Sequence, residues 1–135
     1  MRPSLLPLLL GVLWLLPACA PSGTATVATG IDTTGDLIEY LGARGYVLRP
    51  AGTTLPHVLD VAGQVYEVQN AEARIAIYEF DSAQAAEQGA DAFQLETLGG
   101  DRAALYQRGR LVVASSGGDA SLELTLTQAL GPATY

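Results

Sequence analysis

The stretch ARIAIYEF, residues 73–80, decides the fold of this chain. Successive side chains of a β-strand point to opposite faces, so the two isoleucines lie on one face and Ala76, Tyr78 and Phe80 on the other. Both faces are apolar, which is typical of a strand that is covered on both sides. The stretch therefore predicts a central strand of a sheet.

The same pattern returns in RLVVASS, residues 110–116. A shorter alternating stretch and a turn precede each apolar strand, which predicts two hairpins. The first hairpin joins Val65–Gln69 to Ala73–Phe80, and the second joins Ala103–Gln107 to Arg110–Ser115. Because a helical segment is expected after each hairpin, the chain contains two hairpin-plus-helix units.

The first of these helices is expected to follow Asp81 and to run through Phe93. Asp81 is the expected N-cap residue, with Gln84 three residues later as in a capping box. Ala86 and Ala90 share one face with Phe93. Their small side chains predict close packing of this helix on the sheet.

The second helix is expected from Asp119 to Leu130. The leucines at positions 122, 124 and 126 alternate as in a strand, so a strand is the alternative. The Gly131-Pro132 pair that follows is a typical helix stop. The stop signal and the repeat both favour the helix.

Before the first hairpin, a helix is expected from Asp36 to Arg44, capped by Thr33 or Thr34. A short strand at Tyr46-Val47-Leu48 follows, and residues 51–57 are expected to form a loop. The elements together predict an α+β fold with a mostly antiparallel sheet of about five strands and two or three helices. Their order is helix-strand followed by the two hairpin-plus-helix units, with helices on at least one face of the sheet.

The first nineteen residues contain one positive charge, Arg2, and an apolar run from Leu5 to Leu16. This run is shorter than the roughly 18 to 20 residues of a membrane-spanning helix and is typical of an export signal. The segment Leu16-Pro17-Ala18-Cys19 resembles the lipobox of bacterial lipoproteins. That resemblance implies cleavage before Cys19 and a diacylglycerol on its thiol. An ordinary secretory cleavage around Ala18-Cys19-Ala20 is the alternative.

The rest of the chain is similar to small bacterial envelope lipoproteins and exported proteins of uncharacterised function. The residues that carry this resemblance are Asp36-Leu37-Ile38 through Gly45, Ile77-Tyr78-Glu79-Phe80, and Gly109 through Gly117-Gly118-Asp119 to Pro132. The resemblance implies a signal peptide over residues 1–18, a lipidated Cys19 with a flexible linker over 19–34, and one α+β domain over 35–135. It also implies export, and because Ala20 is not aspartate, it favours the periplasmic face of the outer membrane in a host with two membranes.

The charge balance excludes several kinds of partner and chemistry. After removal of residues 1–18, six arginines face fourteen carboxylates, which gives a net charge of −8. Such a surface repels phosphate backbones, so no nucleic-acid partner is expected. The chain has no lysine for Schiff-base chemistry, and its single cysteine has no second thiol for a disulfide.

His57, the only histidine, is the one candidate general base. A small hydrolase would need it beside Asp60 and a serine, either Ser82 or one of the pair at 115 and 116. No nucleophile motif places these residues together, so no catalytic residue is assigned. One histidine and a lipidated cysteine cannot build the usual zinc shell, and no metal or cofactor is expected.

Two polar groups invite a functional interpretation and have a simpler structural one. Residues 115–119, Ser-Ser-Gly-Gly-Asp, could cradle an anion between strand and helix, but a helix cap explains Asp119 fully. Glu67 and Glu79, with Asp81 nearby, could form a carboxylate pair for acid–base work or calcium. Solvated strand ends are the preferred interpretation.

Tyr66, Tyr78 and Tyr106 are the candidate ligand-binding residues, since each offers an apolar ring with a polar tip. Packing within the sheet is the simpler role for all three. The favoured function is a lipid-anchored, non-catalytic envelope module that binds a protein, peptide or small ligand through the sheet or an edge strand. A small hydrolase using His57 with a serine and a structural accessory of envelope assembly are the alternatives.

Overall fold

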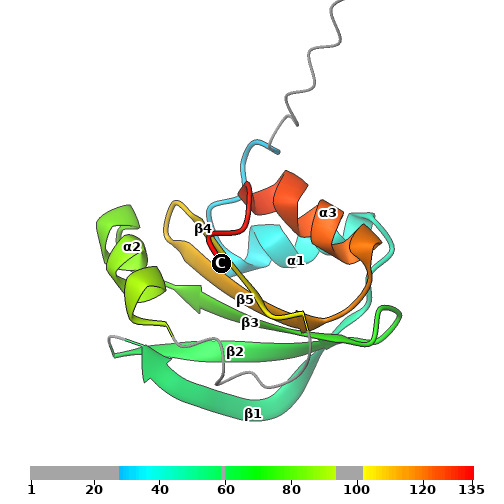
Figure 1. The fold of residues 1–135 in the computed structure, drawn as a ribbon, viewed down its shortest axis with the longest axis horizontal. Helices are drawn as coiled ribbons and strands as arrows, with labels where there is room; N and C mark the ends of the chain where they lie inside the picture. The colour runs from blue at the N-terminus through cyan, green and yellow to red at the C-terminus, as the bar shows by residue number, and fades with distance from the viewer. Residues whose placement is uncertain (1–27, 59, 94–101) are drawn as a thin grey trace, which may run out of the picture.

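The computed structural model describes residues 28–58, 60–93 and 102–135 (Figure 1). The expected signal peptide, Cys19 and the first part of the expected linker lie outside the described residues. The elements in chain order are α1 Thr34–Ala43, β1 Leu48–Val58, β2 Val61–Val68, β3 Ala73–Glu79, α2 Ala83–Ala92, β4 Ala104–Arg108, β5 Leu111–Gly117 and α3 Ala120–Leu130. The predicted α+β fold and its two hairpin-plus-helix units are confirmed.

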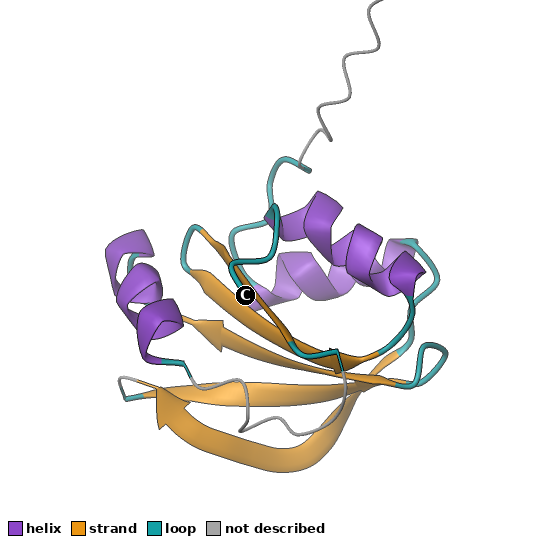
Figure 2. Cartoon of the chain, viewed as in Figure 1, coloured by secondary structure: helices purple, strands orange, loops and turns teal. Residues whose placement is uncertain are grey.

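The five described strands form one antiparallel sheet in the order β1-β2-β3-β5-β4. The predicted central strand, β3, is the middle strand, and both of its faces are covered. Figure 2 shows α1 and α3 together on one side of the sheet and α2 apart from them. The buried alanines of α2 pack against Ala76 and Tyr78, on the other face of the sheet. Helices on both faces explain why β3 is apolar on both sides.

Two hydrophobic cores flank the sheet. Ile75 and Ile77 belong to the core beneath α1 and α3, with Leu37 and Leu126 from those helices. The other core lies between the opposite face of the sheet and α2. Its buried side chains are Val65, Ala76, Tyr78, Phe80, Leu105, Val112, Ala114, Ala86 and Ala90. The alternation predicted from residues 73–80 therefore separates the two cores.

The small residues of α2 bring it close to the sheet, as predicted. Ala86 and Gly89 are buried, and a Cβ atom at Gly89 would overlap the ring of Phe80. This helix is capped by Ser82, whose hydroxyl accepts a hydrogen bond from the Ala85 N–H at 3.1 Å. The prediction of Asp81 as the cap is wrong, because the helix begins one residue later and Ser82 reaches the open N–H groups.

The other two helix caps agree with the sequence. Thr33 caps α1, and Asp36 completes a capping box by accepting a hydrogen bond from the Thr33 N–H at 2.9 Å. Asp119 caps α3 through the Leu122 N–H at 2.9 Å. Residues 120–130 form a helix, so the strand alternative for this segment is wrong.

Strand β1 differs most from expectation. Residues 51–57, expected as a loop, lie within this strand, and Tyr46 and Val47 lie before it. Strand β2 begins at Val61 and pairs along β1 with two register shifts. Pro50 and Pro56 do not prevent this pairing, because β1 is an edge strand, where prolines are tolerated.

The end of the expected linker packs on the domain. Ile31 is buried in the core beneath α1 and α3, and the Ala28 N–H donates to the Gln128 carbonyl at 2.7 Å. The linker boundary at residue 34 is therefore corrected, since residues 28–34 belong to the folded unit.

Candidate functional site

The three candidate tyrosines do not line one groove. Tyr78 is fully buried on the α2 side, where its ring meets Phe93 edge to face at 5.5 Å. Tyr106 is buried on the opposite side of the sheet, in the core beneath α1 and α3. Tyr66 is half-buried against the same core beneath α1 and α3, and its hydroxyl donates to the Gln64 side-chain oxygen at 2.8 Å. The structure thus brings none of the three tyrosines to a shared surface.

Burial also limits the chemistry of these phenols. Loss of solvation raises the pKa of Tyr78 and is the largest cause of the raised pKa of Tyr106. Hydrogen bonds with Thr127 and Ser115 act in the opposite direction on Tyr106. Both phenols therefore stay protonated at neutral pH and serve as packing groups with a satisfied polar end.

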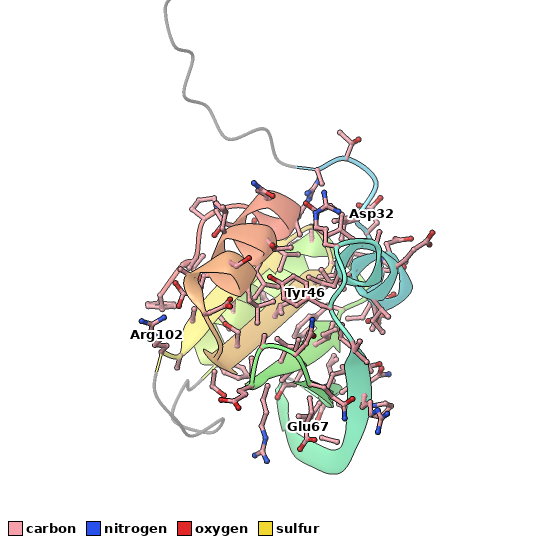
Figure 3. All side chains as sticks on the ribbon, turned by 90° about the vertical axis from the view of Figure 1, so that its right-hand side faces the viewer. Asp32, Tyr46, Glu67 and Arg102 are labelled. Atoms are coloured by element: carbon pink, nitrogen blue, oxygen red, sulfur yellow. The ribbon has the colours of Figure 1, made fainter. Side chains whose placement is uncertain are left out.

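The two glutamates of the first hairpin lie apart. Glu67 is opposite Arg74 in the β2–β3 ladder and pairs with it at 3.6 Å, while Glu79 pairs with Arg110 at 3.1 Å. Asp81 is exposed beyond the end of β3. Figure 3 shows Glu67 on the side of the molecule away from Asp32, and Asp32 is close to the start of the described chain. The carboxylates form no pair for acid–base work.

The turn between β2 and β3 lies against the start of α3 and forms two open hollows. Their volumes are about 320 and 460 Å³, and both are lined by Gln69 and Glu72. Glu72 has a φ of +48°. The Glu72 carbonyl lies close to Gly117, where an added Cβ would approach the carbonyl oxygen to 2.8 Å. Asp119 lines the larger hollow but is occupied as a helix cap. Both hollows are wide open to solvent.

The hydrolase residues come from separate strands. His57 belongs to β1, and its side chain lies outside the described part of the structure. Ser115 and Ser116 are buried on β5, which β2 and β3 separate from β1. The Ser82 hydroxyl caps α2, and Asp60 is exposed in the turn after β1.

The outer edge of β4 is the feature that sequence reasoning missed. Three hydrogen bonds join Leu105 to the end of the chain. The Leu105 N–H donates to the Tyr135 carbonyl at 3.2 Å, and the Leu105 carbonyl accepts from the Thr134 N–H at 2.7 Å and from its hydroxyl at 3.0 Å. Residues 132–135, called here the closing segment, thus cover the outward backbone groups of Leu105, although they form no strand.

Local sequence places the closing segment at this edge. Gly131 ends α3 with a φ of +91°, and Pro132 cannot continue the helix. Figure 1 shows the end of the chain beside β4, with α2 on one side and α3 on the other in this view. The Arg108 guanidinium donates to the Ala129 carbonyl, which ties the end of β4 to the end of α3.

A hollow of about 270 Å³ lies beside the closing segment. Its lining residues come from α2, β4 and the closing segment: Glu87, Ala90, Asp91, Gln107, Thr134 and Tyr135. Tyr135 is 67% exposed, and the Tyr135 atom that bonds to the sheet is its backbone carbonyl oxygen. This edge combines outward backbone groups on β4 with an adjoining hollow, and it is the candidate site.

No protein-family model, curated protein or solved structure matches this chain. Within residues 28–58, 60–93 and 102–135, every helix is too short or too polar to cross a membrane. The same ranges contain no group of three or more histidine, cysteine, aspartate or glutamate residues that could hold a metal ion.

Proposed function

We propose that this protein is a lipid-anchored, non-catalytic envelope module that binds an extended segment of another envelope component by strand addition at β4. The observation that carries the proposal is the seating of the closing segment on Leu105. Main-chain hydrogen bonds at a sheet edge are the general means by which domains recognise extended peptides. The outward N–H and carbonyl of Leu105 are the groups that such a partner would use.

The closing segment occupies only part of this edge. Leu105 directs its N–H and carbonyl away from β5, and in an antiparallel ladder the residue two positions later has the same orientation. Gln107 therefore presents a second outward pair of backbone groups. A longer partner strand would use both residues and replace the three bonds of the closing segment with a larger set.

The opposite edge of the sheet is less suited to this role. Pro50 and Pro56 remove two backbone donors from β1, and its two register shifts make the edge irregular. Prolines and irregularities of this kind are common protections against strand addition. The β4 edge, with a regular five-residue ladder to β5, is the better template.

The position of the tether supports a partner at the same membrane surface. Ala28 is bonded to Gln128 near the end of α3, and Arg108 binds Ala129 at the same end. Nine residue steps lead from Cys19 to Ala28, a distance of at most about 30 Å in a fully extended chain. A lipid on Cys19 would therefore keep the β4 edge near the membrane surface, no farther away than this length plus the diameter of the domain.

Site-specific photo-crosslinking in intact cells tests the proposal. A benzophenone amino acid replaces Gln107 beside the edge or, as the matched control, the exposed Glu39 on α1. We expect one discrete adduct from position 107, no such adduct from position 39, and a several-fold higher yield when the chain ends at Pro132. Equal adducts from both positions, or no effect of removing residues 133–135, would show that β4 is not the binding edge.

The non-catalytic part of the proposal has its own assay. The full chain is tested against broad esterase, peptidase and glycosidase substrates beside a His57→Ala variant. We expect no turnover above the blank in either protein. Turnover that disappears with His57→Ala would instead support the hydrolase alternative.

A further inference from the structure

The hollow beside the closing segment has a distinct charge. Its charged lining residues are Glu87 and Asp91, both exposed and both on α2. Residues four apart on a helix lie on the same face, so the two carboxylates face the same space. No arginine is among its described lining residues.

These carboxylates are uncompensated within the described part of the chain. The ion pairs there are Glu67–Arg74, Arg102–Glu123 and Arg110–Glu79, and none involves α2. Like charges four residues apart disfavour a helix. Asp91 also lies in the last turn, which has no basic residue, where the helix dipole favours a cation. The local electrostatics therefore favour a positive group in this hollow.

We infer that the segment added to β4 is basic, with a lysine or arginine side chain that lies in the hollow against Glu87 and Asp91. The inference rests on the proposed strand addition, because the closing segment marks where such a side chain would enter. Thr134 and Tyr135 sit on the edge of β4 and also line the hollow. A strand in their place directs every second side chain to the same face.

The two parts of the site have different roles. Backbone bonds to Leu105 and Gln107 accept any extended sequence, so they contribute affinity without selecting residues. Exposed carboxylates contribute modestly to affinity but disfavour acidic segments and speed the approach of basic ones. Their contribution decreases with salt, because the pair is exposed to solvent.

Three blocked hexapeptides of alternating threonine and valine test this inference, each with one central arginine, citrulline or glutamate. Their binding to the full chain is measured in an uncharged detergent, at low and high salt. Glu87→Gln with Asp91→Asn removes the charge at nearly constant size, and Glu39→Gln on α1 is the matched control. We expect the arginine peptide to bind about tenfold more tightly than the glutamate peptide at low salt. The double variant and high salt should both remove this preference, and Glu39→Gln should keep it.

The outcomes separate the two proposals. Equal binding of the three peptides, or a preference that persists in the double variant, overturns the basic-segment inference and leaves strand addition standing. No binding of any peptide, even when the chain ends at Pro132, overturns strand addition and the inference with it.

Discussion

The carboxylate of Glu79 accepts two hydrogen bonds from Thr34, one from the backbone N–H and one from the hydroxyl, both at 2.9 Å. Thr34 is the first residue of α1, and Glu79 is the last residue of β3. The open N–H groups at a helix start favour a nearby anion. Arg110 binds the other carboxylate oxygen at 3.1 Å, so the Glu79 side chain joins α1 and β3 to the turn between β4 and β5.

The first prediction concerns this junction. Glu79→Gln keeps the size of the side chain and removes its charge, and we expect it to lower the free energy of unfolding by about 1 kcal/mol, after allowance for partial solvent exposure. Urea unfolding at neutral pH measures the change. The control is Glu67→Gln, which removes a surface pair with Arg74 and should change stability by less than about 0.5 kcal/mol. Equal effects of the two variants would deny Glu79 its special role.

The second prediction concerns pH. The Thr34 N–H is the largest cause that lowers the pKa of Glu79, and the Thr33 hydroxyl is the largest cause that lowers the pKa of Asp36. Both groups bind protons more weakly in the folded state, so their contribution is present above the ordinary values of 4.5 and 3.8 and is lost as pH falls below them. We expect the midpoint of urea unfolding to decrease between about pH 5 and pH 3. Glu79→Gln should make that decrease smaller, and an unchanged slope would contradict it.

The third prediction concerns the contact of α2 with the sheet. Gly89→Ala adds a methyl group that overlaps the Phe80 ring. We expect it to lower the free energy of unfolding by about 1 to 3 kcal/mol. Gly42→Ala is the matched control in α1, because no atom outside its own helix lies within 4 Å of the added Cβ. Alanine there should stabilise the protein by about 0.5 to 1 kcal/mol. Thermal melts of both variants check the two signs, and stabilisation by Gly89→Ala would place α2 farther from Phe80.

The fourth prediction concerns the closing segment. In a chain that ends at Pro132, the Leu105 N–H loses its acceptor on residue 135 and should exchange with deuterium many-fold faster. The Tyr106 amide points to β5 and is the internal control, which should keep its protection. Hydrogen exchange followed by NMR distinguishes the two amides. Equal protection of Leu105 in both chains would show that the segment does not pair with β4 in solution.

The fifth prediction concerns the anchor. Because the resemblance assigns the lipid to Cys19, Cys19→Ser should move the protein out of the membrane fraction or leave it uncleaved. Fractionation and intact mass measure the two outcomes. The chain has no lysine, so an amine-reactive dye reports the α-amino group alone and shows whether it is blocked. A variant that fractionates with the membrane and has the wild-type mass would rule out the lipoprotein assignment.

Sequence reasoning succeeded where the signal lies within a few residues. The two-sided apolar pattern at Ile75 to Tyr78 identified the central strand, and the caps at Thr33 and Asp119 located two helix starts. It failed at Asp81, because the adjacent Ser82 offers an equally good capping oxygen. It also failed along β1, because turn-forming residues conceal a strand that is held by its pairing with β2.

The fold class, the central strand and the order of the hairpin-plus-helix units follow from the amino-acid sequence alone. Alternation, caps and turns are local properties, and burial of the two apolar faces enforces them. Three relationships emerge only in the folded chain: Tyr78 and Tyr106 lie in different cores, Glu67 and Glu79 lie apart, and Thr134 and Tyr135 cover Leu105. These relationships depend on strand order and on backbone hydrogen bonds, which join residues distant in the chain and leave no mark in side-chain pattern.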